Sequence, residues 1–507
     1  MGLHDFTIYD VISRNAVLHA DRDALVYGDV RMTFRDYKIK CDRCAAGLVE
    51  QGIQLGDRIA VVAHNSDYFM ILYGAAAKIG AIVVPVNWRF QCSEISHILK
   101  DCTPKALFAG SEYLNAAAEA AENVASIEMW YAMSAQSDLP SFQPFETLYR
   151  KKGADTTYDI PAEAGYVIIH TAAVEGTPRG ALLSQGNVIA TNIQILAQER
   201  MGEDACHLCI LPLFHIAALS TSMAILHGGA KNVIVDRFDP ALALRLIEAE
   251  RVTTFGSFAP ILKMLIDAHK ETPCDLSSLR SIGGLEDPES VRTILTLAPH
   301  AVFYSGYAQT EAIPVTGGNA ADRPGSAGKP ALLARVSLFD DYDNEVPLGE
   351  PGEICVQSPS VFQGYWNMEE ATAYTFRNGW HHTGDIGRFD EEGYLWYVKR
   401  KAQKELIKPG GENVYPAEVE KAILSHDGIE DVCVIGVPDE TWGEAIKAVC
   451  VPKAGADLSP QELIDYVTTK IARYKKPKYV LFVERLPRTT EGDIDRAQVK
   501  IDHGGKY

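Results

Sequence analysis

The sequence predicts an α/β fold in two parts. The first is a large N-terminal domain of layered α/β subdomains with a small β-barrel-like part, and the second is a small, mobile α+β C-terminal domain. Buried-strand runs alternate with amphipathic helical segments through the first 300 residues, and a turn-rich stretch of short strands follows. With 507 residues, the chain is also too long for one ordinary core.

The strand runs of the N-terminal part are bounded by helical patterns on both sides. They are Arg58 to Ala63, Ile82 to Val86, Gly165 to Thr171, Cys206 to Pro212 and Asn232 to Val235. Strands that alternate with helices in this way predict parallel sheets with helices on their faces.

The pattern changes in the last third of the chain. From Arg323 to Tyr397, short strands separated by Gly, Pro and Asp turns predict an antiparallel sheet or small barrel. A compact region follows Arg400, with expected helices near Pro416–His426 and Ser459–Ile471 and a strand near Val432–Val437. We therefore place the domain boundary near 400, with domains at 1–400 and 401–507.

The composition and charge argue against partners such as nucleic acids and membranes. A net charge of −19 argues against a nucleic-acid partner or an anionic membrane surface. The longest apolar candidate, Gly74 to Val86, is interrupted by Lys78 and is too short to span a bilayer. No leader-like segment opens the chain, so a cytoplasmic location is expected. A homodimer is left open.

The ten cysteines include two C-x-x-C pairs, Cys41/Cys44 and Cys206/Cys209. The first pair shares the apolar face of a predicted helix, and the second flanks a predicted strand, where residues three apart point to opposite faces. We expect core positions for both pairs, with a metal or redox role as the minor alternative.

The most informative stretch runs from Thr383 to Glu420. Asp385 follows a glycine and can accept hydrogen bonds from the vicinal hydroxyls of a ribose. A basic segment comes next, and then Gly410 and Gly411 allow close backbone approach to a ligand. Pro416 suits a first helical turn. In order and spacing, these segments resemble the acyl-adenylate-forming superfamily, and within it the AMP-forming acyl-CoA synthetases.

The resemblance implies a carboxylic acid:CoA ligase that uses ATP, Mg²⁺ and coenzyme A with a small-molecule acid. In this family the C-terminal domain acts as a lid over the N-terminal adenylate/acyl-binding domain and rotates between two half-reactions. One pose forms the acyl-adenylate, and the other admits the thiol. The segment Arg400 to Lys404 is the expected hinge, because such a rotation needs a few residues that absorb backbone change.

Two segments resemble the family's nucleotide-binding motifs. The loop His170 to Asn187 takes the place of the phosphate loop, with Val174 and Glu175 at its usually hydroxyl-rich centre and Arg179 in place of the common lysine. The segment Tyr304 to Glu311 resembles the adenine and magnesium motif. The implied nucleotide-binding set is Thr171, Gly176, Gly283, Ser305, Gly306, Tyr307, Thr310, Asp385 and Arg400. The implied catalytic residues are Thr310, Glu311 and Arg179, with Glu311 also the metal ligand. Taken alone, the first segment would be an ordinary strand-turn-helix loop, and a strand end with a solvated Glu311 is the minor alternative for the second.

The resemblance also implies an acyl pocket and a coenzyme A site. The acyl pocket would be formed by His215, Ser257, Phe258 and Gly284. The coenzyme A site would be formed by Gly410, Gly411, Glu412, Arg473 and Lys475. A solvated charge cluster is an equal alternative for the two basic residues.

A further departure from the family pattern lies near the C-terminus. Asp493 stands where the family has its catalytic lysine, within Leu486-Pro-Arg-Thr-Thr-Glu-Gly-Asp493. A reversed charge near the reacting phosphate opposes adenylation. Three hypotheses remain: a complete ligase that uses substitutes such as Arg179, Arg488 or Lys500, an enzyme that mainly performs the adenylate-to-thioester step or its reverse, and a non-catalytic acyl-nucleotide or CoA-binding protein.

Overall fold

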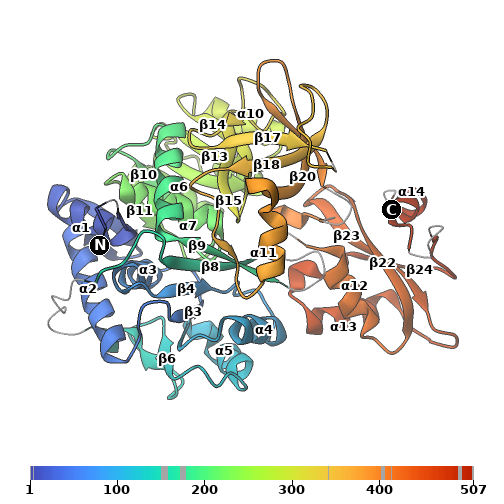
Figure 1. The fold of residues 1–507 in the computed structure, drawn as a ribbon, viewed down its shortest axis with the longest axis horizontal. Coiled ribbons are helices and arrows are strands. Elements are labelled where there is room, and N and C mark those ends of the chain that lie inside the picture. Colours follow the sequence, from blue (N-terminus) through green and yellow to red (C-terminus); the bar gives the residue numbers. More distant parts are fainter. Residues whose placement is uncertain are drawn as a thin grey trace.

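The computed structural model describes residues 2–3, 5–149, 158–171, 178–340, 342–400, 406–412, 414–488 and 494–504. The expected hinge residues 401–404, Gly176, Asp493 and the side chain of Arg400 lie outside the described residues. The large N-terminal part fills most of the view in Figure 1, and the C-terminal part lies at one end.

An eight-stranded sheet forms one layer of the N-terminal part. Its strands, in sheet order, are β19 (Gly364–Tyr365), β9 (Arg179–Ser184), β8 (Gly165–Thr171), β4 (Ile82–Pro85), β3 (Arg58–Val62), β5 (Ala106–Ala109), β6 (Met129–Ala132) and β7 (Gln143–Pro144). The pairs β3–β4 and β3–β5 are parallel, whereas β8 and β9 are antiparallel. Central parallel strands are covered on both faces, which explains their almost wholly apolar sequences.

A nine-stranded sheet forms the second layer. Its strands, in sheet order, are β16 (Lys329–Pro330), β15 (Ala312–Asn319), β14 (Val302–Gln309), β13 (Ser281–Leu285), β12 (Thr254–Phe258), β10 (Cys206–Cys209), β11 (Lys231–Ile234), β1 (Asp23–Tyr27) and β2 (Val30–Thr33). The run from β14 to β1 is parallel throughout. The carboxyl ends of β12, β13 and β14 therefore meet at one edge, where ligands bind in open α/β sheets.

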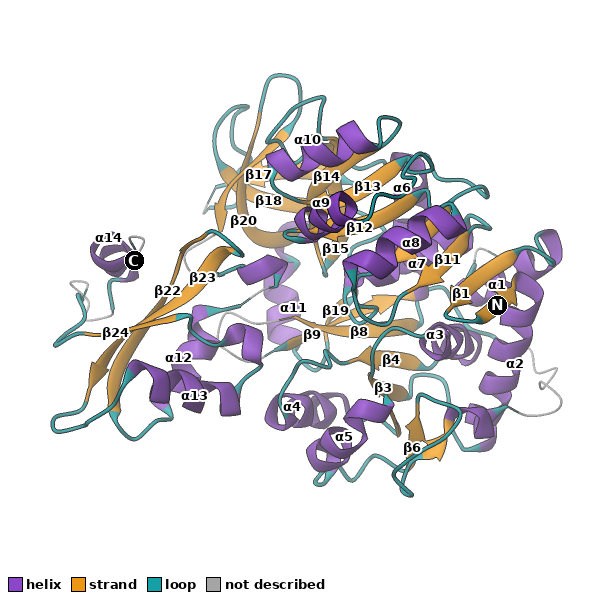
Figure 2. Ribbon diagram, turned by 180° about the vertical axis from the view of Figure 1, so that it is seen from behind, coloured by secondary structure: helices purple, strands orange, loops and turns teal. Residues whose placement is uncertain are grey.

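Helices cover these sheets, and those of the N-terminal part are α1 (Ile8–Leu18), α2 (Phe34–Glu50), α3 (Asp67–Ile79), α4 (Cys92–Cys102), α5 (Leu114–Ala121), α6 (Gln185–Gln198), α7 (Ile216–His227), α8 (Pro240–Glu250), α9 (Ile261–Glu271), α10 (Pro288–Leu297) and α11 (Glu369–Thr375). Figure 2 shows α8, α9 and α10 over one face of the nine-stranded sheet. Local chemistry sets where helices begin. For example, Ser184 Oγ accepts from the Asn187 amide and Asn187 Oδ1 accepts from the Ser184 amide at the start of α6.

The predicted turn-rich region forms an antiparallel four-stranded sheet. It contains β17 (Arg335–Phe339), β18 (Gly352–Gln357), β20 (His381–Phe389) and β21 (Leu395–Arg400). The C-terminal part contains α12 (Pro416–Leu424), β22 (Ile429–Asp439), β23 (Gly443–Pro452), α13 (Pro460–Lys470), β24 (Tyr479–Phe482) and α14 (Arg496–His503). The mixed α/β architecture, with a large N-terminal and a small C-terminal domain, is confirmed. The domain boundary near 400 stays a prediction.

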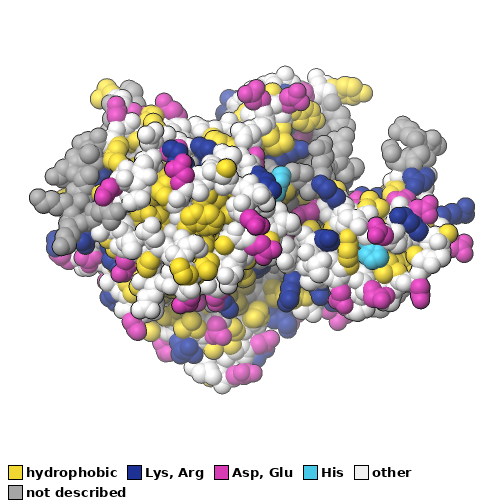
Figure 3. All heavy atoms as spheres, turned by 90° about the horizontal axis from the view of Figure 1, so that it is seen from below, with side chains coloured by type: hydrophobic (Ala, Val, Ile, Leu, Met, Phe, Trp, Pro, Cys, Tyr) yellow, Lys and Arg dark blue, Asp and Glu magenta, His cyan; other side chains and the backbone are white. Residues whose placement is uncertain are grey.

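The long apolar run of the sequence belongs to the core. It forms the end of α3, which is buried on nearly all sides, and the central strand β4. Its one charge, Lys78, pairs with Asp42. Among the described residues, no helix has the length and apolar character needed to cross a bilayer. The face in Figure 3 carries acidic and basic side chains interspersed.

The cysteine pairs occupy core positions. Cys41 and Cys44 are buried in α2, and Cys206 and Cys209 are buried at the two ends of β10. Burial raises the pKa of the Cys41 and Cys209 thiols, the latter to about 11, which makes them poor thiolate ligands.

Candidate functional site

Tyr307 and Asp385, predicted to bind the adenine and the ribose, lie in direct contact although 78 positions separate them. The Tyr307 hydroxyl donates to Asp385 Oδ2 at 2.6 Å, and Gln309 Nε2 donates to the same oxygen at 2.7 Å. Gln309 also donates to the Thr383 carbonyl at 2.9 Å. The end of β14 and the start of β20 are thus joined around one buried carboxylate.

A buried polar network behind Asp385 sets the course of β20, and the sequence reasoning missed it. Glu353 on β18 accepts from the Gly384 amide at 2.8 Å through Oε1. Its other oxygen, Oε2, lies 3.1 Å from both His382 Nδ1 and Arg377 Nη2. In the sequence, this network is marked by the Gly-Glu dipeptide that opens β18. Glu353 is 3% exposed, so its contacts hold the turn that presents Asp385.

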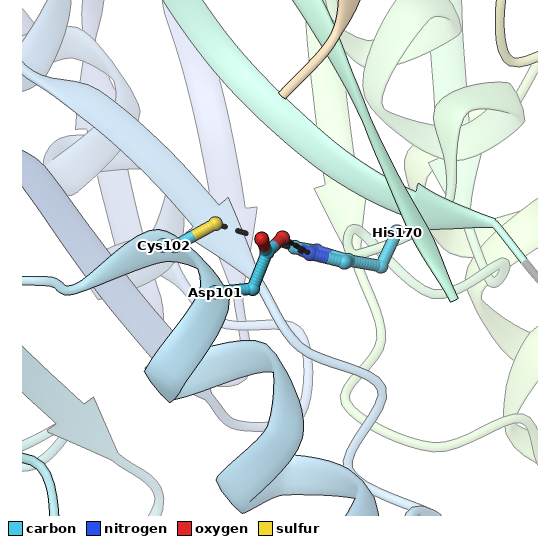
Figure 4. A group of neighbouring side chains, drawn as sticks. All are labelled: Asp101, Cys102 and His170. Carbon is cyan, nitrogen blue, oxygen red and sulfur yellow. Dashed lines mark hydrogen bonds and ion pairs between the residues drawn. The ribbon is translucent and has the colours of Figure 1, made fainter. Parts of the chain in front are cut away.

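The base of the phosphate loop is anchored on β8 and β9. Thr171 pairs with Arg179 and His170 with Gly180 across the two strands, which bracket the undescribed residues 172–177. His170 and the α4 residue Asp101 point toward each other, with 3.0 Å between His170 Nε2 and Asp101 Oδ2 (Figure 4). Cys102 Sγ lies 3.9 Å from the same nitrogen. This hydrogen-bonded group ties the loop base to α4.

Glu311 and Arg179 meet at a residue that the sequence analysis did not single out. The Tyr365 hydroxyl donates to Glu311 Oε1 at 2.8 Å, and the Arg179 guanidinium lies 5.6 Å from the Tyr365 ring centroid. Burial, and then the neighbouring Glu311, raise the pKa of Tyr365 well above its usual value, so the hydroxyl keeps its proton and remains a donor. β19 pairs with β9 and places Tyr365 there.

A cavity of about 70 Å³ lies where the N-terminal and C-terminal parts meet. Its lining is Pro85, Asn87, Phe90, Ile98, Ile169, His170, Thr171, Pro178, Phe214, His215, Thr310, Glu412, Tyr474 and Lys475. It therefore brings together residues predicted for the phosphate, acyl and coenzyme A sites. Its apolar wall, with Phe90, Phe214 and Tyr474, was not foreseen.

Charged groups from both parts surround His215 at this cavity. Glu412 Oε1 lies 3.2 Å from Arg89 Nη1, an ion pair between the C-terminal and N-terminal parts. The Arg89 guanidinium also lies 4.2 Å from the Trp88 ring centroid. Burial lowers the pKa of His215, Glu412 opposes this shift and Arg89 adds to it. His215 is therefore a neutral imidazole at neutral pH.

Lys475, predicted to meet coenzyme A phosphates, is 2% exposed and lies between two carboxylates. Its Nζ is 2.6 Å from Glu94 Oε1 on α4 and 2.5 Å from Glu418 Oε1 on α12. Burial opposes the charged form, but the two carboxylates outweigh it and raise the pKa of Lys475. In this pose the ammonium thus links the two parts of the chain, whereas Arg473 is exposed.

The remaining predicted acyl-pocket residues lie on β12 and β13, outside the cavity lining. Ser257 is fully buried and donates to Glu286 Oε1 at 2.6 Å. Gly284 has a φ of 149°, and a Cβ there would overlap the Ser257 carbonyl oxygen, so only glycine fits. Phe258 is half-buried at the carboxyl end of β12. Their role in binding an acyl group stays a prediction.

In the predicted coenzyme A loop, Gly410 has a φ of 58°, and a Cβ there would come within 2.7 Å of the Trp442 ring. Its amide donates to the Trp442 carbonyl at 3.1 Å. The glycine is therefore required by packing within the C-terminal part, beside any role toward a ligand. Gly411 follows it in the same short helical turn, and Glu412 enters the cavity lining directly afterwards.

Comparisons with known proteins identify the family of the chain. The family model of AMP-binding enzymes matches residues 12–366, and that of the AMP-binding enzyme C-terminal domain matches residues 418–493. The chain is 35% identical to a feruloyl-CoA synthase from Amycolatopsis sp over 97% of this chain and 98% of that protein. It is 33% identical to a long-chain-fatty-acid–CoA ligase from Mycobacterium tuberculosis over 92% of each chain.

The fold also matches solved structures. An o-succinylbenzoate CoA synthetase from Bacillus subtilis superposes with a TM-score of 0.86 at 26% identity, over 98% of each chain. These relatives are CoA ligases, and they give no support to an impaired enzyme or a non-catalytic binding protein. The chain belongs to the AMP-binding enzyme family and is an acid–thiol ligase of the AMP-forming acyl/aryl-CoA ligase type, with ATP and coenzyme A as its substrates.

Proposed function

We propose that this protein activates a small carboxylic acid in two steps, through an acyl-adenylate and then a coenzyme A thioester. One observation carries the proposal: the cavity between the two parts of the chain is lined by Thr171 and Thr310 on one side and by Glu412 on the other. Residues predicted for the nucleotide and residues predicted for the thiol thus line one small cavity. Such proximity lets one site serve two consecutive steps on a bound intermediate.

In the first step, the acid's carboxylate oxygen attacks the α-phosphorus of ATP, and pyrophosphate leaves. Tyr307 offers a ring face to the adenine, and Asp385 accepts from the ribose hydroxyls. Thr310 and Arg179 donate to anionic oxygens. The Arg179 guanidinium contacts the Tyr365 ring, whose hydroxyl holds Glu311, so Tyr365 positions both residues for their roles.

The donor set near Glu311 fits a magnesium ion. A carboxylate and a neighbouring threonine hydroxyl are hard oxygen ligands, and Mg²⁺ takes one or two carboxylates together with phosphate oxygens. A bound ion would neutralise charge that develops on the departing phosphates. The Tyr365 hydroxyl orients the carboxylate of Glu311 for this task.

In the second step, the thiol sulfur of coenzyme A attacks the acyl carbon, AMP leaves and the thiol proton is released. The present pose suits this step, because Glu412 and Tyr474 reach the cavity while α14 lies at the far end of the C-terminal part (Figure 1). Arg488, one of the proposed lysine substitutes, pairs with Asp431 at 2.5 Å in this pose. We therefore assign adenylation to a second pose, reached by rotation near residue 400.

The test is a paired assay over a panel of aryl and fatty acids. One arm supplies acid, ATP, Mg²⁺ and CoA, and the other supplies a synthetic acyl-adenylate and CoA. Thioester in both arms is the expected result. Thioester in the second arm alone would contradict the adenylation half of the proposal, and thioester in neither arm would contradict the whole of it. Thr310→Val keeps the side-chain shape and removes the hydroxyl. It should lower the rate of thioester formation more in the arm that starts from ATP than in the arm that starts from the adenylate.

A further inference from the structure

Glu199, the C-cap residue of α6, takes no part in the contacts described above. Its Oε2 accepts from the Ser281 hydroxyl on β13, and a Cβ at Gly283 would lie 3.0 Å from its Oε1. The carboxylate thus lies on β13, on the face of the sheet that α6 covers. Among the described residues, no lysine, arginine or histidine forms an ion pair with Glu199, and Ser281 is the side chain that donates to it.

The neighbouring strands leave backbone exposed beside this carboxylate. Gly283 pairs with Tyr304, and Gly306 pairs with Gly317, so residues from three adjacent strands share one face. Gly306 is exposed although it lies in the middle of β14, within the nine-stranded sheet. A side chain at Gly317 would overlap the carboxamide of Gln198. An exposed glycine between a carboxylate and a carboxamide is suited to lie under a flat ligand.

The position along β14 relates this surface to the reacting groups. Thr310, at the cavity, follows Gly306 by four residues, which corresponds to about 13 Å of extended strand. At the carboxyl ends of the adjacent strands, the paired side chains of Phe258 and Leu285 are half-buried and exposed, respectively. A ligand that runs from Thr310 toward Glu199 would thus pass apolar surface before it meets a polar end.

We propose that Glu199, with Ser281, recognises a hydroxyl or amino group at the end of an aryl carboxylic acid remote from its carboxylate, and that it selects such acids as substrates. This inference rests on the proposed ligase function and names its substrate class. An ionised carboxylate accepts hydrogen bonds and donates none. A site built to pair a hydroxyl or amino group disfavours an analogue without one, because the half-buried Glu199 carboxylate then loses that partner.

The electrostatic environment is consistent with this role. Burial raises the pKa of Glu199, and the Ser281 hydroxyl opposes the shift. Burial, and then Glu199, also raise the pKa of Tyr304, which places this phenol in the same environment. A donor from the ligand would relieve the cost of keeping the Glu199 charge away from water.

The experiment compares four matched acids, namely 4-hydroxycinnamate, 4-aminocinnamate, 4-methoxycinnamate and cinnamate, with octanoate as a fatty acid. We expect kcat/KM for the hydroxy and amino acids to exceed that of the other two aryl acids by about 10- to 100-fold, the range for a hydrogen bond to a charged group. Glu199→Gln should reduce this preference to within a few fold and leave KM for ATP unchanged. Glu350→Gln, at an exposed turn, is the matched control.

The outcomes separate the inference from the function beneath it. Thioester formation without a preference for donor-bearing acids, or only from octanoate, would overturn the inference and leave the ligase function intact. The same holds if Glu199→Gln retains the full preference, or if 4-methoxycinnamate equals 4-hydroxycinnamate, since a methoxy group cannot donate a hydrogen bond to Glu199. No thioester from any acid would overturn both. Thermal unfolding of each variant identifies a loss of preference that comes only from misfolding.

Discussion

The Tyr307 hydroxyl donates a 2.6 Å hydrogen bond to Asp385 Oδ2. This bond joins β14 of the nine-stranded sheet to β20 of the antiparallel sheet, so two layers of the N-terminal part meet at the predicted nucleotide site. Tyr307→Phe should raise KM for ATP about tenfold, because the carboxylate loses one of its two orienting donors from β14. Steady-state pyrophosphate release measures this effect, and Tyr342→Phe, at an exposed position, should leave KM unchanged.

Tyr365 should matter for magnesium dependence. Tyr365→Phe removes the donor to Glu311 Oε1 but keeps the ring beneath Arg179. We expect adenylation to slow about 10- to 100-fold, as is usual when a residue that orients a metal ligand is lost, with part of the loss recovered at high Mg²⁺. Pyrophosphate release over a Mg²⁺ titration tests this. A rate equal to that of the wild type at low Mg²⁺ would show that the Tyr365 hydroxyl does not orient a metal ligand.

Lys475 should hold the present pose together. Lys475→Met leaves Glu94 and Glu418 facing each other without their shared cation, which should cost roughly 3 kcal/mol or more. The measured quantities are the free energy of unfolding in urea and the rates of the two half-reactions. The thioester step should fall more than adenylation. Lys476→Met, at an exposed neighbouring position, is the control. An equal loss in both half-reactions would argue against a pose-specific contact.

His207 should make stability depend on pH. It is 2% exposed and lies 2.8 Å from Asn232 Oδ1, and burial lowers its pKa to about 4, against the opposing effect of the Asn232 bond. Between about pH 4 and 6.5 the unfolded chain binds more protons than the folded one, so stability falls as the pH falls. The shift corresponds to about 3 kcal/mol. His207→Gln should flatten the dependence in urea unfolding at pH 5 and 7, leaving only the part due to residues such as His227, whose pKa is also lowered.

Asp493 gives a test that rests on sequence alone. If the reversed charge slows adenylation, Asp493→Lys should raise the rate of pyrophosphate formation by at least tenfold, since each ~1.4 kcal/mol changes a rate tenfold. The thioester arm, supplied with a synthetic adenylate, should not change. An unchanged adenylation rate would show that another group replaces the missing catalytic lysine. Adding Arg179→Ala to the Asp493→Lys variant would then test whether that group is Arg179.

Several elements were predictable because short-range patterns determine them. The limits of β8, at Gly165 and Thr171, agree with the predicted strand, and α12 begins at Pro416 as expected. Other limits shifted by a few residues: the predicted strand from Cys206 to Pro212 ends at Cys209, where the chain leaves the sheet. Pairing with β11 and β12 sets that end, and no local pattern encodes it.

By itself, the sequence determined the mixed α/β architecture and the ligase family, because periodicity and motif spacing are local properties of the chain. The residues that it assigns to the nucleotide stay a prediction. Only the tertiary structure decided which partners these residues have. It placed Lys475 between Glu94 and Glu418, Tyr365 against Glu311 and Glu199 beside Ser281. Each pair joins positions far apart in sequence, so its contacts depend on how helices and sheets pack and are invisible to any short window of residues.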